Sequence, residues 1–114
     1  MATVANLNRA RRGAAWLDRH LGRGWRRRIL RRRLDMRAGY YRPNIKGDCG
    51  CILAQLDVSY SSGGDEPGCY LRGLEMVGLH HPSLTPARLG FEVVSDSSYE
   101  DLTDAWLEVL REGT

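Results

Sequence analysis

Residues 97–110, SSYEDLTDAWLEVL, are the stretch that decides the fold. Ser97 and Glu100 fit a capping box, in which a serine hydroxyl and a glutamate side chain satisfy free N–H groups at a helix start. Apolar residues then recur at three- and four-residue spacing, which is typical of a helix with one buried face. They are Leu102, Ala105, Trp106, Val109 and Leu110. We therefore predict an amphipathic helix at the C-terminal end.

A second amphipathic helix is predicted over residues 3–21. Its apolar stripe has the same three- and four-residue spacing and consists of Val4, Leu7, Ala10, Ala14, Leu17 and Leu21. Gly22 follows, and glycine is the preferred residue just beyond a helix end. These two helices are the best-defined elements of the sequence.

Residues 25–37 are predicted to form a helix with two apolar contacts and one arginine ridge. At 100° per residue the apolar side chains fall into two clusters, Trp25 with Ile29 and Met36, and Leu30 with Leu34. The ridge consists of Arg27, Arg28 and Arg31. A strand does not fit, because no alternation survives the run Arg31–Arg33. We expect Trp25 to lie in the core.

The rest of the chain predicts shorter elements. Asp48 is a candidate cap for a buried helix beginning near Cys49, after a loop over residues 38–48. Residues 61–68 are rich in serine, glycine and proline and predict a flexible internal loop. A short helix ended by Gly78 and a one-turn helix begun by Thr85-Pro86 and closed by Gly90 follow. With an extended segment possible near 91–94, the fold class is mostly α: one compact domain, 1–114, of about five helices.

Charge is divided unequally along the chain. Residues 1–46 carry thirteen arginines and one lysine against two acids, a net charge of +12. Residues 47–114 carry three arginines against twelve acids, a net charge of −9. Such asymmetry indicates either a polyanionic partner for the basic half or pairing between the two halves. Sixteen arginines against one lysine also indicate the codon bias of a GC-rich genome. The positive charge of these residues is therefore informative about a partner, whereas the choice of arginine over lysine is not.

Composition restricts the class of protein. The apolar runs are only a few residues long, so we expect no membrane span and no membrane partner. No apolar segment follows the first arginines, so we expect no signal peptide. Three cysteines without an export signal predict reduced thiols and a cytoplasmic location.

The arginine cluster is the strongest candidate binding site for nucleic acid or a partner protein. Dense positive charge neutralises phosphates, and nearby tyrosines can stack on exposed bases. The candidate residues are Arg26, Arg27, Arg28, Arg31, Arg32, Arg33, Arg37, Arg42, Tyr40 and Tyr41. The structural alternative is a solvated face, or a ridge paired with acids of the second half such as Glu100, Asp101, Asp104 and Glu108.

Metal binding and catalysis have weaker support. Cys49, Cys51, Cys69, His80 and His81 are the available soft ligands. Zinc sites favour two to four residues between paired cysteines, whereas a single residue separates Cys49 from Cys51. A cysteine nucleophile would need an activated thiolate and an orienting group that the sequence does not identify. We therefore predict a non-enzymatic protein with no cofactor and no metal, and two small buried cysteines at a helix start.

The order of several motifs resembles a family of small uncharacterised proteins from actinobacteria and their phages. The motifs are Gly13-Ala14-Ala15, Leu17-Asp18, Gly24-Trp25, Leu34-Asp35-Met36, residues 49–56 (CGCILAQL), Gly90-Phe91, and Tyr99 with Leu102-Thr103 and Trp106. The resemblance implies a phage or prophage accessory protein and implies no activity or site residues. This chain departs from the pattern at Arg23, where proline is expected, and in its very basic segment 26–33.

Two function classes follow. The first is a non-enzymatic accessory protein that binds nucleic acid nonspecifically through the arginine ridge. The second is a protein-interaction factor that binds or inhibits a host regulatory or defence protein through its polarised charge. The oligomeric state is left open.

Overall fold

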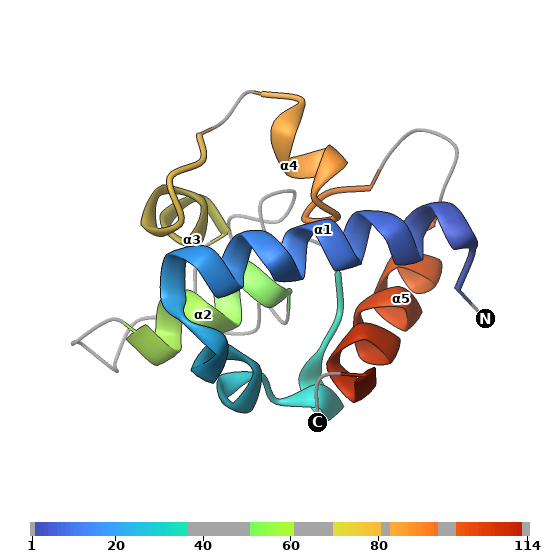
Figure 1. The fold of residues 1–114 in the computed structure, drawn as a ribbon, viewed down its shortest axis with the longest axis horizontal. Coiled ribbons are helices and arrows are strands. Elements are labelled where there is room, and N and C mark those ends of the chain that lie inside the picture. The colour runs from blue at the N-terminus through green and yellow to red at the C-terminus, as the bar shows by residue number, and fades with distance from the viewer. Residues whose placement is uncertain (1, 37–50, 61–69, 81–82, 94–97, 113–114) are drawn as a thin grey trace, which may run out of the picture.

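The computed structural model describes residues 2–36, 51–60, 70–80, 83–93 and 98–112, and these are mostly helical, as predicted (Figure 1). In these ranges the elements are five α-helices and two 3₁₀ helices: α1 (Val4–Leu21), η1 (Arg23–Arg28), η2 (Arg31–Arg33), α2 (Ile52–Tyr60), α3 (Tyr70–Met76), α4 (Thr85–Arg88) and α5 (Tyr99–Glu112). The described residues contain no strand. Helix α1 crosses the molecule, with α5 packed against its N-terminal half and α2 and α3 near its other end (Figure 1).

Both ends of α1 have the expected local chemistry. The Thr3 hydroxyl accepts a hydrogen bond from the Asn6 N–H at 3.3 Å, which satisfies one free donor of the first turn. Gly22 has a φ of +73° and donates its N–H to the Asp18 carbonyl, the positive-φ ending that glycine permits. The predicted stripe is buried in its centre, but Val4 at its start is 72% exposed.

Helix α5 begins one residue later than its capping box predicts. The Ser98 hydroxyl, not that of Ser97, accepts a hydrogen bond from the Asp101 N–H at 3.0 Å; Ser97 lies outside the described residues. The third helical position is therefore occupied by Asp101 rather than by Glu100. The predicted stripe is confirmed, because all five of its residues are buried.

Asp101 joins the start of α5 to the start of α1. Its carboxylate accepts hydrogen bonds from the side-chain amide of Asn6 at 2.6 Å, from the Thr3 N–H at 3.1 Å and from the Thr3 hydroxyl at 2.9 Å. The negative charge also lies at the N-terminus of α1, where the helix dipole favours it. One carboxylate in the first turn of α5 therefore binds the cap residue and the first turn of α1.

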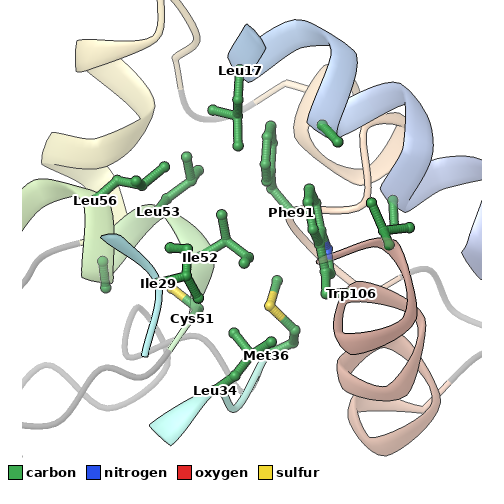
Figure 2. Close-up of a cluster of buried hydrophobic side chains, with 14 of the residues drawn as sticks. Leu17, Ile29, Leu34, Met36, Cys51, Ile52, Leu53, Leu56, Phe91 and Trp106 are labelled. Carbon is green, nitrogen blue, oxygen red and sulfur yellow. The ribbon is translucent and has the colours of Figure 1, made fainter. Parts of the chain in front are cut away.

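Trp106 lies at the centre of the core and is fully buried. Its ring stacks on Phe91 with 5.6 Å between centroids and meets the edge of Trp25 at 6.3 Å. Its indole N–H donates to the Gly90 carbonyl at 2.6 Å, so the polar atom is satisfied. The close-up in Figure 2 shows Trp106 and Phe91 facing the side chains of α2 and Met36. One tryptophan thus connects α1, α4, α5 and η1.

The predicted helix over residues 25–37 is wrong. Residues 25–36 instead form the end of η1, an extended step at Ile29 and Leu30, η2, and a second extended step from Leu34. This path buries Trp25, Ile29, Leu34 and Met36 together. A single α-helix would have placed those residues on two different faces and adjacent arginines at repelling i, i+3 and i, i+4 positions.

Smaller boundary predictions also shift. Helix α2 begins at Ile52 rather than near Cys49, and α4 begins at Thr85, with Leu84 rather than Thr85 at the cap position. Phe91–Val93 is irregular rather than a strand. The predicted loops over 38–48 and 61–68, the Asp48 cap and Val94 lie outside the described residues. The glycine endings at Gly78 and Gly90 are confirmed by positive φ angles of 78° and 76°.

Gly13→Ala is expected to destabilise the protein. A Cβ at Gly13 would lie 2.9 Å from the Trp106 ring and closer still to the Leu89 carbonyl oxygen. The shift of backbone or ring that this overlap forces should lower the free energy of unfolding by about 1–3 kcal/mol. This loss is larger than the stability that alanine adds because it is a better helix former than glycine. Urea denaturation measures the change. Gly24→Ala is the control, because its Cβ would meet nothing within 4 Å; equal effects of the two substitutions would contradict the prediction.

Asp101 is expected to make stability depend on pH. The hydrogen bond from Asn6 is the largest cause that lowers the pKa of Asp101 below its ordinary value, and the Thr3 bonds add to it. A carboxyl with a lowered folded pKa contributes stability above its unfolded pKa and loses that contribution as pH falls through the folded pKa. Asp101→Asn should therefore cost about 1 kcal/mol at pH 7 and less at pH 3. Urea denaturation at both values checks this; an equal cost at both would contradict it.

Candidate functional site

An open hollow lies along the basic segment between η1 and η2. Its volume is about 1040 Å³. Among the described residues, its lining consists of five arginines, one glycine and two apolar residues, namely Arg23, Gly24, Arg26, Arg27, Ile29, Leu30, Arg31 and Arg32. We call this feature the arginine groove. The extended step at Ile29 and Leu30 creates it, because the step separates the two 3₁₀ turns that carry the arginines.

The η1 side of the groove is anchored to α1 through Asp18. Its carboxylate accepts a hydrogen bond from the Trp25 indole at 2.8 Å and forms an ion pair with Arg26 at 3.1 Å. The Arg26 guanidinium also lies 5.2 Å from the centre of the Trp25 ring. Partial burial raises the pKa of Asp18, but the hydrogen bonds from Arg26 and Trp25 together outweigh it and leave the pKa lowered. Asp18 therefore stays charged and fixes Arg26.

Gln55 of α2 holds the extended step in place. Its side-chain oxygen accepts a hydrogen bond from the Leu30 N–H at 2.6 Å, and its side-chain amide donates to the Leu30 carbonyl at 3.3 Å. Both backbone groups of Leu30 are thus satisfied by one amide, as a neighbouring strand would satisfy them. The Leu30 side chain is left 48% exposed in the groove.

Arg31 connects the η2 side of the groove to α5. Its guanidinium donates to the Leu110 carbonyl at 3.2 Å. Carbonyl groups in the last turn of a helix lack intrahelical donors, and the dipole makes that end partly negative. Arg31 therefore stabilises the end of α5 while its remaining N–H groups are available to the groove.

Arg28 turns away from the groove toward α2. It donates to the Ser59 carbonyl at 3.2 Å and to the Ser59 hydroxyl at 3.1 Å, and lies 4.2 Å from the centre of the Tyr60 ring. This arginine belongs to the packing of η1 on α2. Arg33 also lies outside the groove lining and has interactions of its own.

Arg23, Arg27 and Arg32 are exposed arginines of the groove, and within the described ranges none of them makes a hydrogen bond or an ion pair. Arg23 and Arg27 precede the extended step and Arg32 follows it. Their charges are therefore available to an anionic ligand at no cost in internal contacts.

The predicted binding residues divide into three groups. Arg26, Arg27, Arg31 and Arg32 come together in the groove, whereas Arg28 and Arg33 do not line it. Arg37, Tyr40, Tyr41 and Arg42 lie outside the described residues. Sequence reasoning missed Arg23, Leu30, Asp18 and Gln55 as parts of the site. Only Arg23 carried a usable signal, because it extends the same basic run.

The acids of the second half are not the main partners of the groove in the contacts described. Asp101 is held by Thr3 and Asn6, and Glu112 forms an ion pair with Arg11 at 2.7 Å. The carboxylate paired with Arg26 is Asp18, from the basic half itself. The fold therefore leaves a concentrated positive charge at the groove.

The candidate soft ligands are dispersed or undescribed. Cys51 is 1% exposed at the start of α2, as predicted for a small buried residue. His80 is exposed, and Cys49, Cys69 and His81 lie outside the described residues. In the part of the chain that the structure describes, no three histidine, cysteine or acidic residues lie together as metal ligands would.

Comparisons with protein-family models, with curated proteins and with solved structures found no match to this chain. The resemblance to a family of actinobacteria and their phages therefore stays a prediction. Among the described helices, none has both the length and the apolar character needed to cross a membrane.

Arg28→Ala is expected to lower stability while Arg27→Ala is not. Arg28 loses two hydrogen bonds and its contact with the Tyr60 ring, which together contribute about 0.5–1 kcal/mol at an exposed site. Arg27 loses no internal contact, so its replacement should change the free energy of unfolding by less than about 0.5 kcal/mol. Thermal and urea denaturation measure both variants. Equal destabilisation would show that the two arginines have the same structural role.

Proposed function

We propose that this protein is a non-enzymatic accessory protein that binds nucleic acid without sequence specificity through the arginine groove. The observation that carries the proposal is the convergence of five arginines on one open hollow. Arg27 and Arg32, on its two sides, have no hydrogen bond or ion pair within the described ranges. A surface that served the fold alone would not need these two charges.

The physical basis is the neutralisation of phosphates. Each guanidinium that contacts a phosphate releases condensed counterions, so affinity falls log-linearly with salt. Arg26 and Arg31 are fixed by Asp18 and by the end of α5, so they lose little side-chain freedom on binding. Arg23, Arg27 and Arg32 supply charge that has no partner among the described residues. The groove therefore combines two preorganised cations with three that respond to the ligand.

The resemblance to proteins of actinobacteria and their phages adds a setting to this proposal. A phage or prophage accessory protein in the host cytoplasm encounters abundant nucleic acid. The second candidate, a factor directed at a host regulatory or defence protein, would use the same positive groove against an acidic surface. The nucleic-acid proposal is preferred because five of the described residues that line the groove are arginines and none of them is acidic.

The double variant Arg27→Glu, Arg32→Glu is expected to lose nucleic-acid binding. Fluorescence anisotropy with a labelled mixed-sequence 30-mer should give wild-type log affinity falling with log salt at a slope of about −2 to −4. The variant should bind at least about tenfold more weakly and reduce that slope by about 2. The protein should stay folded, because neither residue makes a described internal contact.

The matched control is Arg12→Glu with Arg88→Glu, which changes the net charge equally on the side of α1 that faces α4. It should bind the 30-mer within about threefold of wild type at 150 mM salt, because neither residue lines the groove and salt screens exposed charges that do not contact the ligand. Equal loss in both double variants would assign binding to overall charge rather than to the groove. Failure of the wild-type protein to bind any nucleic acid at low salt would reject the proposal.

A further inference from the structure

Leu30 gives the arginine groove an apolar contact site. Of the two apolar residues that line the groove, Ile29 is 5% exposed and belongs to the core, whereas Leu30 is 48% exposed. The Leu30 backbone is held at both its N–H and its carbonyl by Gln55. The side chain is therefore presented to solvent from a fixed position rather than from a mobile loop.

Arginines that line the groove stand on both sides of Leu30 along the chain. Arg26 and Arg27 precede the extended step, and Arg31 and Arg32 follow it. A polynucleotide has the complementary order, because every base lies between two phosphates along the strand. In an acidic peptide the placement of apolar groups between carboxylates depends on the amino-acid sequence, whereas in a polynucleotide the backbone itself imposes the alternation.

We propose that the groove binds single-stranded nucleic acid, with one base packed against Leu30 and the flanking phosphates bound by Arg27 and Arg32. This inference rests on the proposed function and specifies the form of nucleic acid. An unpaired base has a free apolar face, and single-strand binding sites combine a positive groove with side chains, most often aromatic, that contact such faces. Leu30 supplies an aliphatic contact in that place. In a duplex the faces of the bases are covered by stacking.

Duplex binding fits the groove less well. A phosphate backbone can be reached by exposed arginines, but base faces are reached only when an apolar side chain projects as a wedge into a groove of the duplex and unstacks a step. Leu30 lines a hollow between two turns instead of projecting from a convex surface. A flexible single strand can enter such a hollow and place a base there.

The test compares Leu30→Asn with wild type on three labelled probes: a 12-nucleotide oligothymidine, an abasic oligonucleotide with the same number of phosphates, and a 12-base-pair duplex. Wild type should bind oligothymidine about fivefold or more tighter than the abasic strand and than the duplex. Leu30→Asn should lose about three- to tenfold for oligothymidine, because part of a leucine is no longer buried. Its affinity for the abasic strand should be unchanged.

Leu71→Asn is the matched control, because Leu71 is 44% exposed on α3 and lies outside the groove lining. It should leave all three affinities unchanged, and thermal denaturation should confirm that both variants are folded. Equal affinity of wild type for oligothymidine and for the abasic strand would overturn the inference while leaving the proposed function in place. If wild type bound the duplex more tightly than oligothymidine, the single-strand inference would likewise be overturned and the proposed function would remain.

A fourth probe separates the two classes of macromolecule. Poly-L-glutamate of the same charge as the 12-mer should bind more weakly than oligothymidine and should not respond to Leu30→Asn. Equal affinity for poly-L-glutamate would overturn the single-strand inference in favour of an acidic protein partner. Absence of binding to every oligonucleotide at low salt would reject both the inference and the proposed function.

Discussion

The burial of Trp106 is the constraint on which the rest of the structure depends. Its ring needs a close approach to α1, which Gly13 permits because it has no Cβ. Its N–H needs an acceptor, which Gly90 supplies after α4. Its edge meets Trp25, whose own N–H is satisfied by Asp18. Because Asp18 also binds Arg26, the placement of the arginine groove follows from the packing of two tryptophans. The site is therefore coupled to the core rather than added to its surface.

The same core explains why the basic segment is not helical. Trp25, Ile29, Leu34 and Met36 all reach the interior, and their spacing does not match one face of an α-helix. Short 3₁₀ turns joined by extended residues allow each apolar side chain to turn inward in its own step. The irregular path costs regular hydrogen bonds, and Gln55 replaces two of them at Leu30.

The two long helices could be predicted from the sequence because one physical signal, apolar periodicity, determined each of them. The stripe of α5 is buried as predicted, and α1 ends at Gly22 as predicted. The basic segment could not be predicted in the same way, because two incompatible apolar clusters are resolved only by the shape of the surrounding core. The candidate site was also only partly predictable. Its positive charge was visible in the sequence, whereas the roles of Asp18 and Gln55 depend on contacts with Arg26, 8 residues away, and with Leu30, 25 residues away.

Part of the unequal division of charge along the chain is explained by contacts within the fold. The acids Asp101 and Glu112 of the second half bind Thr3, Asn6 and Arg11 of α1, so part of the asymmetry holds the two ends of the chain together. Asp18 neutralises Arg26 from within the basic half. The arginines with structural partners thus account for much of the positive charge, and a net charge alone is a poor measure of a binding site. Within the described ranges, the groove arginines whose charge has no structural partner are Arg23, Arg27 and Arg32, and along the chain Arg27 and Arg32 stand on the two sides of the exposed Leu30.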